Sequence, residues 1–152
     1  MPQEPNDEDL VLLAYDGSRH AVAAIEEAAR QLRPRRALVL TVLEPLEAVP
    51  YRGAPFSAIP TEIAEDMWGR AQLVSEEGGK LAAAAGFEAE TLVERGAPAW
   101  SRIIEVADER NASLIVLGSR GLTGLKQVLL GSVASAVAQH AERSVLLTHL
   151  PS

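Results

Sequence analysis

The sequence predicts an α/β fold in which a single open sheet of five parallel strands has helices on both faces. Five short apolar runs alternate along the chain with segments whose apolar residues recur at helical spacing. Strands that are buried on both faces read as continuous apolar runs, and this alternation of strand and helix is typical of a parallel sheet. The length of 152 residues suits one compact domain with its own core.

The first third of the chain contains two of these strands and a helix. After an acidic tail over residues 1–9, which we expect to be flexible, the run Leu10–Tyr15 predicts the first strand. Asp16-Gly17-Ser18 predicts a turn, with Ser18 as the N-cap of a helix that ends at Pro34. Ala37–Leu43 predicts the second strand. The apolar stripe of the helix consists of Ala21, Ala24, Ile25, Ala28, Ala29 and Leu32.

A long proline-containing loop follows, from Glu44 to Pro60. Its four prolines (Pro45, Pro50, Pro55 and Pro60) favour extended backbone and exclude the segment from a helix or sheet interior. Loops of this length in compact domains are often lids or binding segments. A variable surface loop is the simpler interpretation, and we prefer it.

The middle of the chain predicts a helix, an edge strand and a second helix. Thr61 is expected to cap a helix that runs to about Gly86, and Glu88–Val93 is a strand of mixed polarity, as an edge strand would be. Gly96-Ala97-Pro98 predicts a turn, with Pro98 in the first turn of the next helix. The residues that this helix is expected to bury are Ile103, Ile104 and Ala107.

The last third predicts two strands joined by a glycine-rich loop and a helix. The strand Leu114–Leu117 leads into the loop, the helix runs from about Ser132 to Ala141, and Val145–Leu150 is the fifth strand. Right-handed crossovers with helices on both faces require the winding to reverse once, and a Rossmann-like order of 3-2-1-4-5 satisfies this requirement. That order brings the Asp16 turn and the glycine-rich loop to one crevice at the carboxyl ends of the strands, where ligands bind in such sheets.

The glycine-rich loop has the features of a phosphate-binding segment. Two residues separate Gly118 from Gly121, nine separate Gly121 from Gly131, and Ser132 follows at the start of a helix. Glycines let backbone amides approach a ligand, and a helix N-terminus adds free N–H groups and a positive dipole end. Neither of the two common phosphate-loop motifs occurs. The alternative interpretation is a long structural turn between strand and helix.

Each candidate side chain near this crevice has a functional and a structural interpretation. Asp16 is positioned to accept from a ribose hydroxyl or to hold Mg²⁺, or it forms an Asx-turn. Ser132 either donates to a phosphate or caps the last helix. Within the loop, Ser119 and Arg120 are candidate contacts, and Arg120 would neutralise phosphate charge or remain solvated. Two residues at strand ends either line an adenine slot or pack in the sheet: Tyr15 and Val42.

Composition excludes several classes of function. The chain has no cysteine, so disulfides, thiolate nucleophiles and cysteine-bound zinc are excluded. The three histidines lie far apart, which argues against a histidine metal site, and no Gly-x-Ser-x-Gly elbow occurs. The net charge of −7 argues against nucleic acid or an anionic membrane as the main partner. No run has transmembrane length and no export signal is evident, so we expect a cytoplasmic location.

The residues of the loop resemble a known family. The pattern Gly118-x2-Gly121-x9-Gly131-Ser132 is similar to the ATP-binding signature of the universal stress protein family. The opening Val-Leu-Leu-Ala-Tyr-Asp-Gly-Ser and the Gly96-x-Pro98 turn also resemble that family, and the resemblance extends from Leu10 to about Leu150. It implies ATP with Mg²⁺ as the ligand and a cytoplasmic homodimer that pairs through the last strand, Val145–Leu150.

The resemblance also implies roles for individual residues. Asp16 would contact the ribose or the metal side of the nucleotide, and Val42 would meet adenine through its backbone. The residues that would surround the ribose and phosphates are Gly118, Gly121, Gly131, Ser132 and Val133.

Three functions remain open at this point. The first is an ATP-binding regulatory protein of the universal stress type, in which nucleotide occupancy biases a conformation or an assembly. The second is a slow ATPase or autophosphorylating enzyme that uses Asp16 with magnesium and Ser132 near the phosphates. The third is a dimerisation or interaction module with a vestigial pocket. The intact glycine signature beside few catalytic candidates favours the first, with an unknown protein partner.

Overall fold

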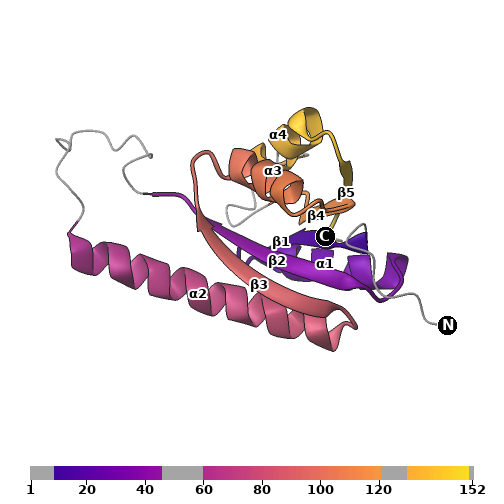
Figure 1. Ribbon diagram of the computed structural model, residues 1–152, viewed down its shortest axis with the longest axis horizontal. Coiled ribbons are helices and arrows are strands. Elements are labelled where there is room, and N and C mark those ends of the chain that lie inside the picture. The colour runs from indigo at the N-terminus through magenta and orange to yellow at the C-terminus, as the bar shows by residue number, and fades with distance from the viewer. Residues whose placement is uncertain (1–8, 46–59, 121–129, 151–152) are drawn as a thin grey trace.

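In the part of the chain that the structure describes, the strands form one parallel sheet of five, in the order β3-β2-β1-β4-β5. The computed structural model describes residues 9–45, 60–120 and 130–150, and Figure 1 shows how their elements are arranged. The predicted fold class and strand order are confirmed. In chain order the elements are β1 (Val11–Ala14), α1 (Arg19–Gln31), β2 (Arg36–Leu43), α2 (Thr61–Ala84), β3 (Glu88–Arg95), α3 (Ala99–Glu109), β4 (Leu114–Gly118), α4 (Ser132–His140) and β5 (Ser144–Thr148).

The sheet has a separate hydrophobic core on each face. Along β1, Leu12 faces the core beneath α3 and α4, whereas Val11 and Leu13 face the core beneath α1 and α2. This division follows from the period of two in a strand, because successive side chains point to opposite faces. Figure 1 shows α2 along one side of the sheet with α3 and α4 on the other. Each fully buried aliphatic side chain contributes about 1.5–3 kcal/mol relative to an exposed one.

The predicted helix caps are correct at α1 but wrong at α2. The Ser18 Oγ accepts a hydrogen bond from the Ala21 amide, 3.1 Å away, which confirms Ser18 as the N-cap of α1. Thr61 is already the first residue of α2, and Pro60 occupies the N-cap position, where its side chain has no acceptor to offer. The amide hydrogen bonds of the first turn go to the Pro60 carbonyl instead, from Ile63 and Ala64.

Smaller corrections concern α3 and the ends of the strands. Pro98 lies one residue before α3, at its N-cap, with extended backbone. Val106 is buried there with Ile103 and Ala107, whereas Ile104 is half-buried. The spacing of three and four residues places the three buried side chains on one stripe. β5 ends at Thr148 rather than Leu150 because its partner β4 ends at Gly118, which pairs with Thr148.

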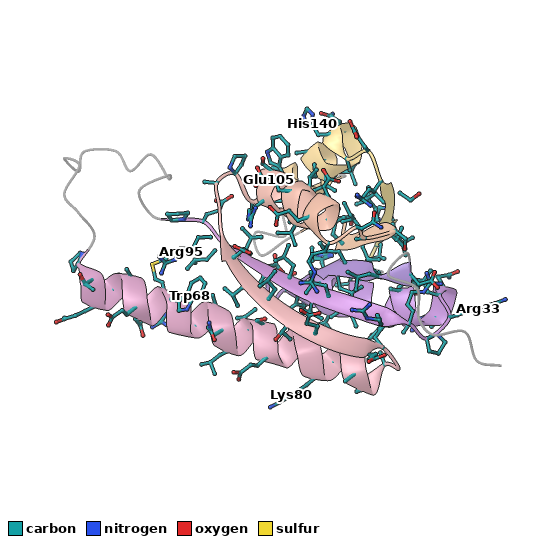
Figure 2. The ribbon with its side chains drawn as sticks, in the orientation of Figure 1. Arg33, Trp68, Lys80, Arg95, Glu105 and His140 are labelled. Atoms are coloured by element: carbon teal, nitrogen blue, oxygen red, sulfur yellow. The ribbon has the colours of Figure 1, made fainter. Side chains whose placement is uncertain are left out.

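β3 is an edge strand of the sheet, as its mixed polarity predicted. The helix α2 packs closely against β3 and β2. The close approach depends on Gly78 and Gly79, since a Cβ on either would lie 2.5 Å from a side-chain atom of Tyr15 or Thr91. Near the other end of α2, Arg95 lies over the Trp68 ring, 4.7 Å from its centroid, as Figure 2 shows. Among the helices of the described residues, none is both long and apolar enough to cross a membrane.

Candidate functional site

A cavity of about 450 Å³ opens at the carboxyl ends of β1, β2 and β4. Its volume lies within the usual range of small-molecule sites, roughly 300–1000 Å³. The cavity lies at the point where the strand order reverses between β1 and β4, as predicted for this class of sheet. The residues that line it are Ala14, Tyr15, Asp16, Ala21, Leu40, Val42, Glu44, Ala99, Ile103, Leu117, Gly118, Arg120, Gly131, Ser132, Val133 and Ala134.

The turn after β1 presents Asp16 at the cavity. One carboxylate oxygen, Oδ1, accepts a hydrogen bond from the Ser18 amide at 2.9 Å. The Asx-turn interpretation is therefore correct, and it coexists with a place on the cavity wall. The hydrogen bond fixes the orientation of the carboxylate, and among the described residues its Oδ2 atom has no hydrogen-bond partner. Asp16 thus combines a structural role with an oriented acceptor at the site.

Tyr15 lies at the cavity, but its ring belongs to the opposite face of the sheet. The ring is buried in the core beneath α1 and α2, beside Gly78. Its hydroxyl donates to the Glu77 Oε1 atom at 2.9 Å. Burial raises the pKa of the Tyr15 phenol, and the hydrogen bond and charge of Glu77 raise it further. The sheet-packing interpretation of the Tyr15 side chain is therefore the one that the structure bears out.

The end of β4 brings the two ends of the glycine-rich loop together. The Ser119 carbonyl accepts from the Gly131 amide at 2.6 Å, and the Ser119 amide donates to the Thr148 carbonyl at 2.8 Å. Gly118 packs tightly, since a Cβ there would lie 2.9 Å from the His20 carbonyl oxygen of α1. Ser119 is buried and does not line the cavity, so the structure gives it a framework role. Gly121, like the rest of 121–129, lies outside the described residues.

The N-terminus of α4 faces the cavity, and no side chain of the described residues caps it. Gly131 occupies the N-cap position, with φ −67° and ψ 164°, and Ser132 is the first helical residue. Of the two interpretations of Ser132, the one as cap of the last helix is therefore wrong. The first three amides of the helix, from Ser132 to Ala134, have no partner within the helix, because the first helical bond runs from Ser135 to the Gly131 carbonyl at 2.9 Å. All four residues from Gly131 to Ala134 line the cavity.

Glu44 is a cavity residue that the sequence analysis missed, since it names Asp16 as the one candidate carboxylate near a strand end. Glu44 follows β2 directly, and its Oε1 atom accepts from the Ala99 amide, the first of α3, at 2.8 Å. This contact supplies the cap that Pro98 lacks. Its position directly after an apolar strand, at the same sheet edge as Asp16, could have identified Glu44 as a cavity residue. Its partner is distant in sequence, so the contact follows only from the fold.

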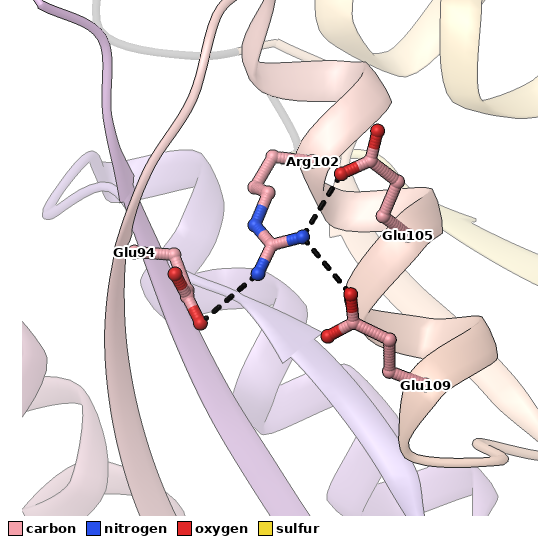
Figure 3. Close-up of polar contacts among 4 residues, drawn as sticks. All are labelled: Glu94, Arg102, Glu105 and Glu109. Atoms are coloured by element: carbon pink, nitrogen blue, oxygen red, sulfur yellow. Dashed lines mark hydrogen bonds and ion pairs between the residues drawn. The ribbon is translucent and has the colours of Figure 1, made fainter.

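An arginine on α3 holds that helix against β3. Figure 3 shows Arg102 between Glu94 of β3 and two glutamates of its own helix. The guanidinium lies 3.2 Å from the Glu94 carboxylate, 2.9 Å from that of Glu105 and 3.1 Å from that of Glu109. Single exposed pairs contribute little, about 0–1 kcal/mol, but a half-buried arginine shared by three carboxylates is a network. It anchors the first turns of α3, and with them Ala99 and Ile103, beside the cavity.

The two ends of the cavity differ in chemistry. Toward β2 and α3 the walls are mostly apolar, with Leu40, Val42 and Ile103. Toward β4 and α4 lie the free amides of the helix and Arg120, which has no ion-pair partner within the described parts of the chain. In residues 9–45, 60–120 and 130–150 no three His, Cys, Asp or Glu side chains gather as a metal site.

The structure thus brings together eight of the ten predicted site residues. The eight are Tyr15, Asp16, Val42, Gly118, Arg120, Gly131, Ser132 and Val133.

Comparison with known proteins matches this chain to one family over nearly its whole length. The model of the universal stress protein family matches residues 9–149. A universal stress protein of Thermus aquaticus is 37% identical over 139 residues, which cover 90% of this chain and 96% of the relative.

Solved structures agree with the architecture. The protein MJ0577 of Methanocaldococcus jannaschii superposes with a TM-score of 0.78 at 23% identity, covering 97% of this chain and 99% of that one. A universal stress protein solved in complex with cAMP has a TM-score of 0.62 at 25% identity, covering 93% and 96%. The first of these shows a shared fold, and the family match rests on the sequence. The chain belongs to the universal stress protein family.

Proposed function

We propose that this protein binds ATP with Mg²⁺ in the cavity and acts as a nucleotide-dependent regulatory protein. The observation that carries the proposal is the uncapped N-terminus of α4, which presents amides without a helical partner to the cavity from Ser132 to Ala134. Amides and a positive dipole end at a helix N-terminus form a general anion site that suits phosphate groups. Arg120 adds a positive charge on the same side of the cavity.

The apolar end of the cavity suits a nucleobase. Leu40, Val42 and Ile103 supply apolar contact near the end of β2 and in the first half of α3. β2 and β4 are separated only by β1, so their ends lie about 10 Å apart at the usual strand spacing. That separation supports a nucleotide with its base against the apolar wall and its phosphates at the amides of α4. A relative of this chain has been solved with cAMP, which supports an adenine nucleotide as the ligand.

The metal proposal depends on Asp16. Mg²⁺ is usually bound through one or two carboxylates together with substrate phosphates, and it keeps several waters. Asp16 offers one oriented carboxylate at the cavity, with Oδ1 engaged by the Ser18 amide and Oδ2 available. Residues of this type fit a magnesium ion that arrives with the nucleotide. The bound ion would neutralise phosphate charge, and the chain would orient it through Asp16.

The proposed assembly is a homodimer that pairs through β5. Within the described part of the chain, β5 has a partner on one side only, β4. Its residues Val145, Leu146 and Leu147 are half-buried, and edge strands of this kind are prone to pair with another chain. Light scattering of the purified protein, with and without ATP, measures the assembly and its dependence on nucleotide.

The experiment that tests the function is identification of the ligand. Protein purified without added nucleotide is heat-denatured, any released adenine nucleotide is identified by chromatography, and the emptied protein is titrated with Mg-ATP by calorimetry. Bound or tightly titrating ATP supports the proposal. No nucleotide and no heat of binding would overturn it. Steady-state ADP formation at about one per second or faster would instead make the protein an ATPase.

A further inference from the structure

Glu44 is held in place from two directions. Its main chain continues from β2, whose last residue Leu43 pairs with Arg95 and accepts from the Gly96 amide at 3.2 Å. Its side chain is fixed by the Ala99 amide, which donates to Oε1 at 2.8 Å. Since the carboxylate is planar, fixing one oxygen restricts where the other can lie. Glu44 therefore presents an oriented group to the cavity rather than a freely rotating one.

This carboxylate stands at the apolar end of the cavity. The neighbouring walls are Leu40 and Val42 from the same strand and Ile103 from α3. The amides of α4 and Arg120 stand at the other end, so a nucleotide with its phosphates there directs its base toward Glu44. An ionised carboxylate accepts hydrogen bonds and donates none. The group that it suits at this end is therefore an N–H donor on an otherwise flat, apolar ligand.

We infer that Glu44 is a specificity-determining residue, which accepts a hydrogen bond from the exocyclic amino group of the bound base. The inference rests on the proposed nucleotide function and goes beyond it by assigning base selection to one side chain. An adenine base carries such an amine at C6. A purine with hydrogen at C6 lacks the donor and leaves the carboxylate without its partner.

The competing role for Glu44 is that of a cap for α3 and nothing more. The two roles separate in the Glu44→Gln variant. The amide oxygen of the introduced glutamine is needed to accept from the Ala99 N–H, so its NH₂ group faces the cavity. That group is a donor and cannot accept from an amine. The variant thus preserves the cap and removes the acceptor.

The test compares two ligands in three proteins by calorimetry with Mg²⁺ present. The ligands are ATP and purine riboside triphosphate, which differ only at C6. The proteins are the wild type, Glu44→Gln and Glu62→Gln. Glu62 is the matched control because it is an exposed glutamate in the first turn of another helix, α2, and does not line the cavity.

The wild type and Glu62→Gln are expected to bind ATP about three- to tenfold more tightly than the analogue, because the Glu44 carboxylate is exposed and water can take the place of the missing amine. Glu44→Gln is expected to lose this preference while its thermal midpoint stays close to that of the wild type. Glu44→Asp, in which the carboxylate is drawn back by one methylene, is expected to reduce the preference and serves if Glu44→Gln fails to fold.

The outcomes distinguish a failure of base selection by Glu44 from a failure of the proposed nucleotide binding. No binding of either ligand to the wild type would overturn the nucleotide function itself. Binding of ATP without preference over the analogue would overturn the inference alone. A preference retained in both Glu44 variants would also overturn it and leave Glu44 as the cap of α3.

Discussion

The helices α1, α3 and α4 all begin at the carboxyl edge of the sheet, and they differ in how their first amides are satisfied. At α1 the Ser18 hydroxyl accepts from the Ala21 amide. At α3 the Glu44 carboxylate, from the end of β2, accepts from the Ala99 amide. At α4 the N-cap is a glycine, and no side chain of the described residues caps the helix. The protein's own oxygens thus occupy the anion-binding positions of α1 and α3, and that of α4 remains open to a ligand.

Among these three helices, the way the first amides are satisfied predicts which N-terminus binds phosphate. All three N-termini have the same dipole and the same kind of free amides, so a count of helix starts would assign each an equal chance of binding phosphate. A capped terminus has already satisfied an amide with an oxygen of the chain. The open terminus at α4 is the one whose amides gain a partner when a phosphate arrives.

Closing the open terminus is expected to give the largest effect. In Gly131→Asp the new carboxylate caps α4 by accepting from the Val133 or Ala134 amide. The backbone of Gly131, at φ −67° and ψ 164°, accommodates any residue. We expect ATP affinity to fall about 100-fold, since phosphate loses its donors and meets a like charge. Stability should rise by only about a few tenths of a kcal/mol, because glycine is itself a tolerated N-cap residue. Calorimetry and thermal unfolding measure the two effects.

Gly131→Asn is the matched control for this variant. Asparagine caps a helix about as well as aspartate but carries no charge, so it separates the loss of donors from repulsion. It should weaken ATP binding less than Gly131→Asp and stabilise the helix similarly. If Gly131→Asp instead binds ATP as the wild type does, the α4 terminus is not where the phosphates lie.

The next effect concerns Gly118, the last residue of β4. In Gly118→Ala the new Cβ would lie 2.9 Å from the His20 carbonyl oxygen, a backbone atom that cannot rotate away. We expect a loss of about 2 kcal/mol of stability from overpacking, which corresponds to roughly 4–8 °C in melting temperature. Thermal unfolding without nucleotide measures it.

Gly69→Ala is expected to change the stability in the opposite direction to Gly118→Ala. Gly69 lies inside α2 and a Cβ there meets nothing within 4 Å, so alanine should stabilise the helix by about 0.5–1 kcal/mol. Unchanged stability in Gly118→Ala would show that α1 shifts to make room, and would return Gly118 to a purely ligand-binding role.

Gly118 also illustrates what the sequence could predict. The sequence correctly predicted that Gly118 and Gly131 lie at the cavity, because the strand that ends at one and the helix that begins after the other are visible as local patterns. The sequence could not show that Gly118 is needed for packing against His20, since that contact joins residues far apart along the chain. The fold class was predictable because continuous apolar strands are a local property.

The role of Glu44, in contrast, could not be predicted from the sequence. Its carboxylate meets the Ala99 amide only after β2 and β3 pair in register and the chain turns back into α3. Until then it reads as the first residue of a proline-containing loop. The helix starts near Thr61 and Ser132 were predicted correctly, but the cap residues were not, because Pro60 and Gly131 hold the N-cap positions one residue earlier. Local sequence patterns thus predicted where helices begin, whereas contacts between residues distant in sequence determined which residue caps each helix.

The smallest effect in the comparison is expected at the capped terminus of α1. In Ser18→Ala the Ala21 amide loses its acceptor, and the expected loss is about 1 kcal/mol, or roughly 2–4 °C in melting temperature. ATP affinity should stay the same, because Asp16 is oriented by the backbone amide of Ser18, which alanine retains. Ser18→Asn, which restores a capping oxygen, should recover the stability. A fall in ATP affinity of about tenfold or more in a folded Ser18→Ala protein would contradict this division, because it would mean that the α1 terminus also takes part in binding the nucleotide.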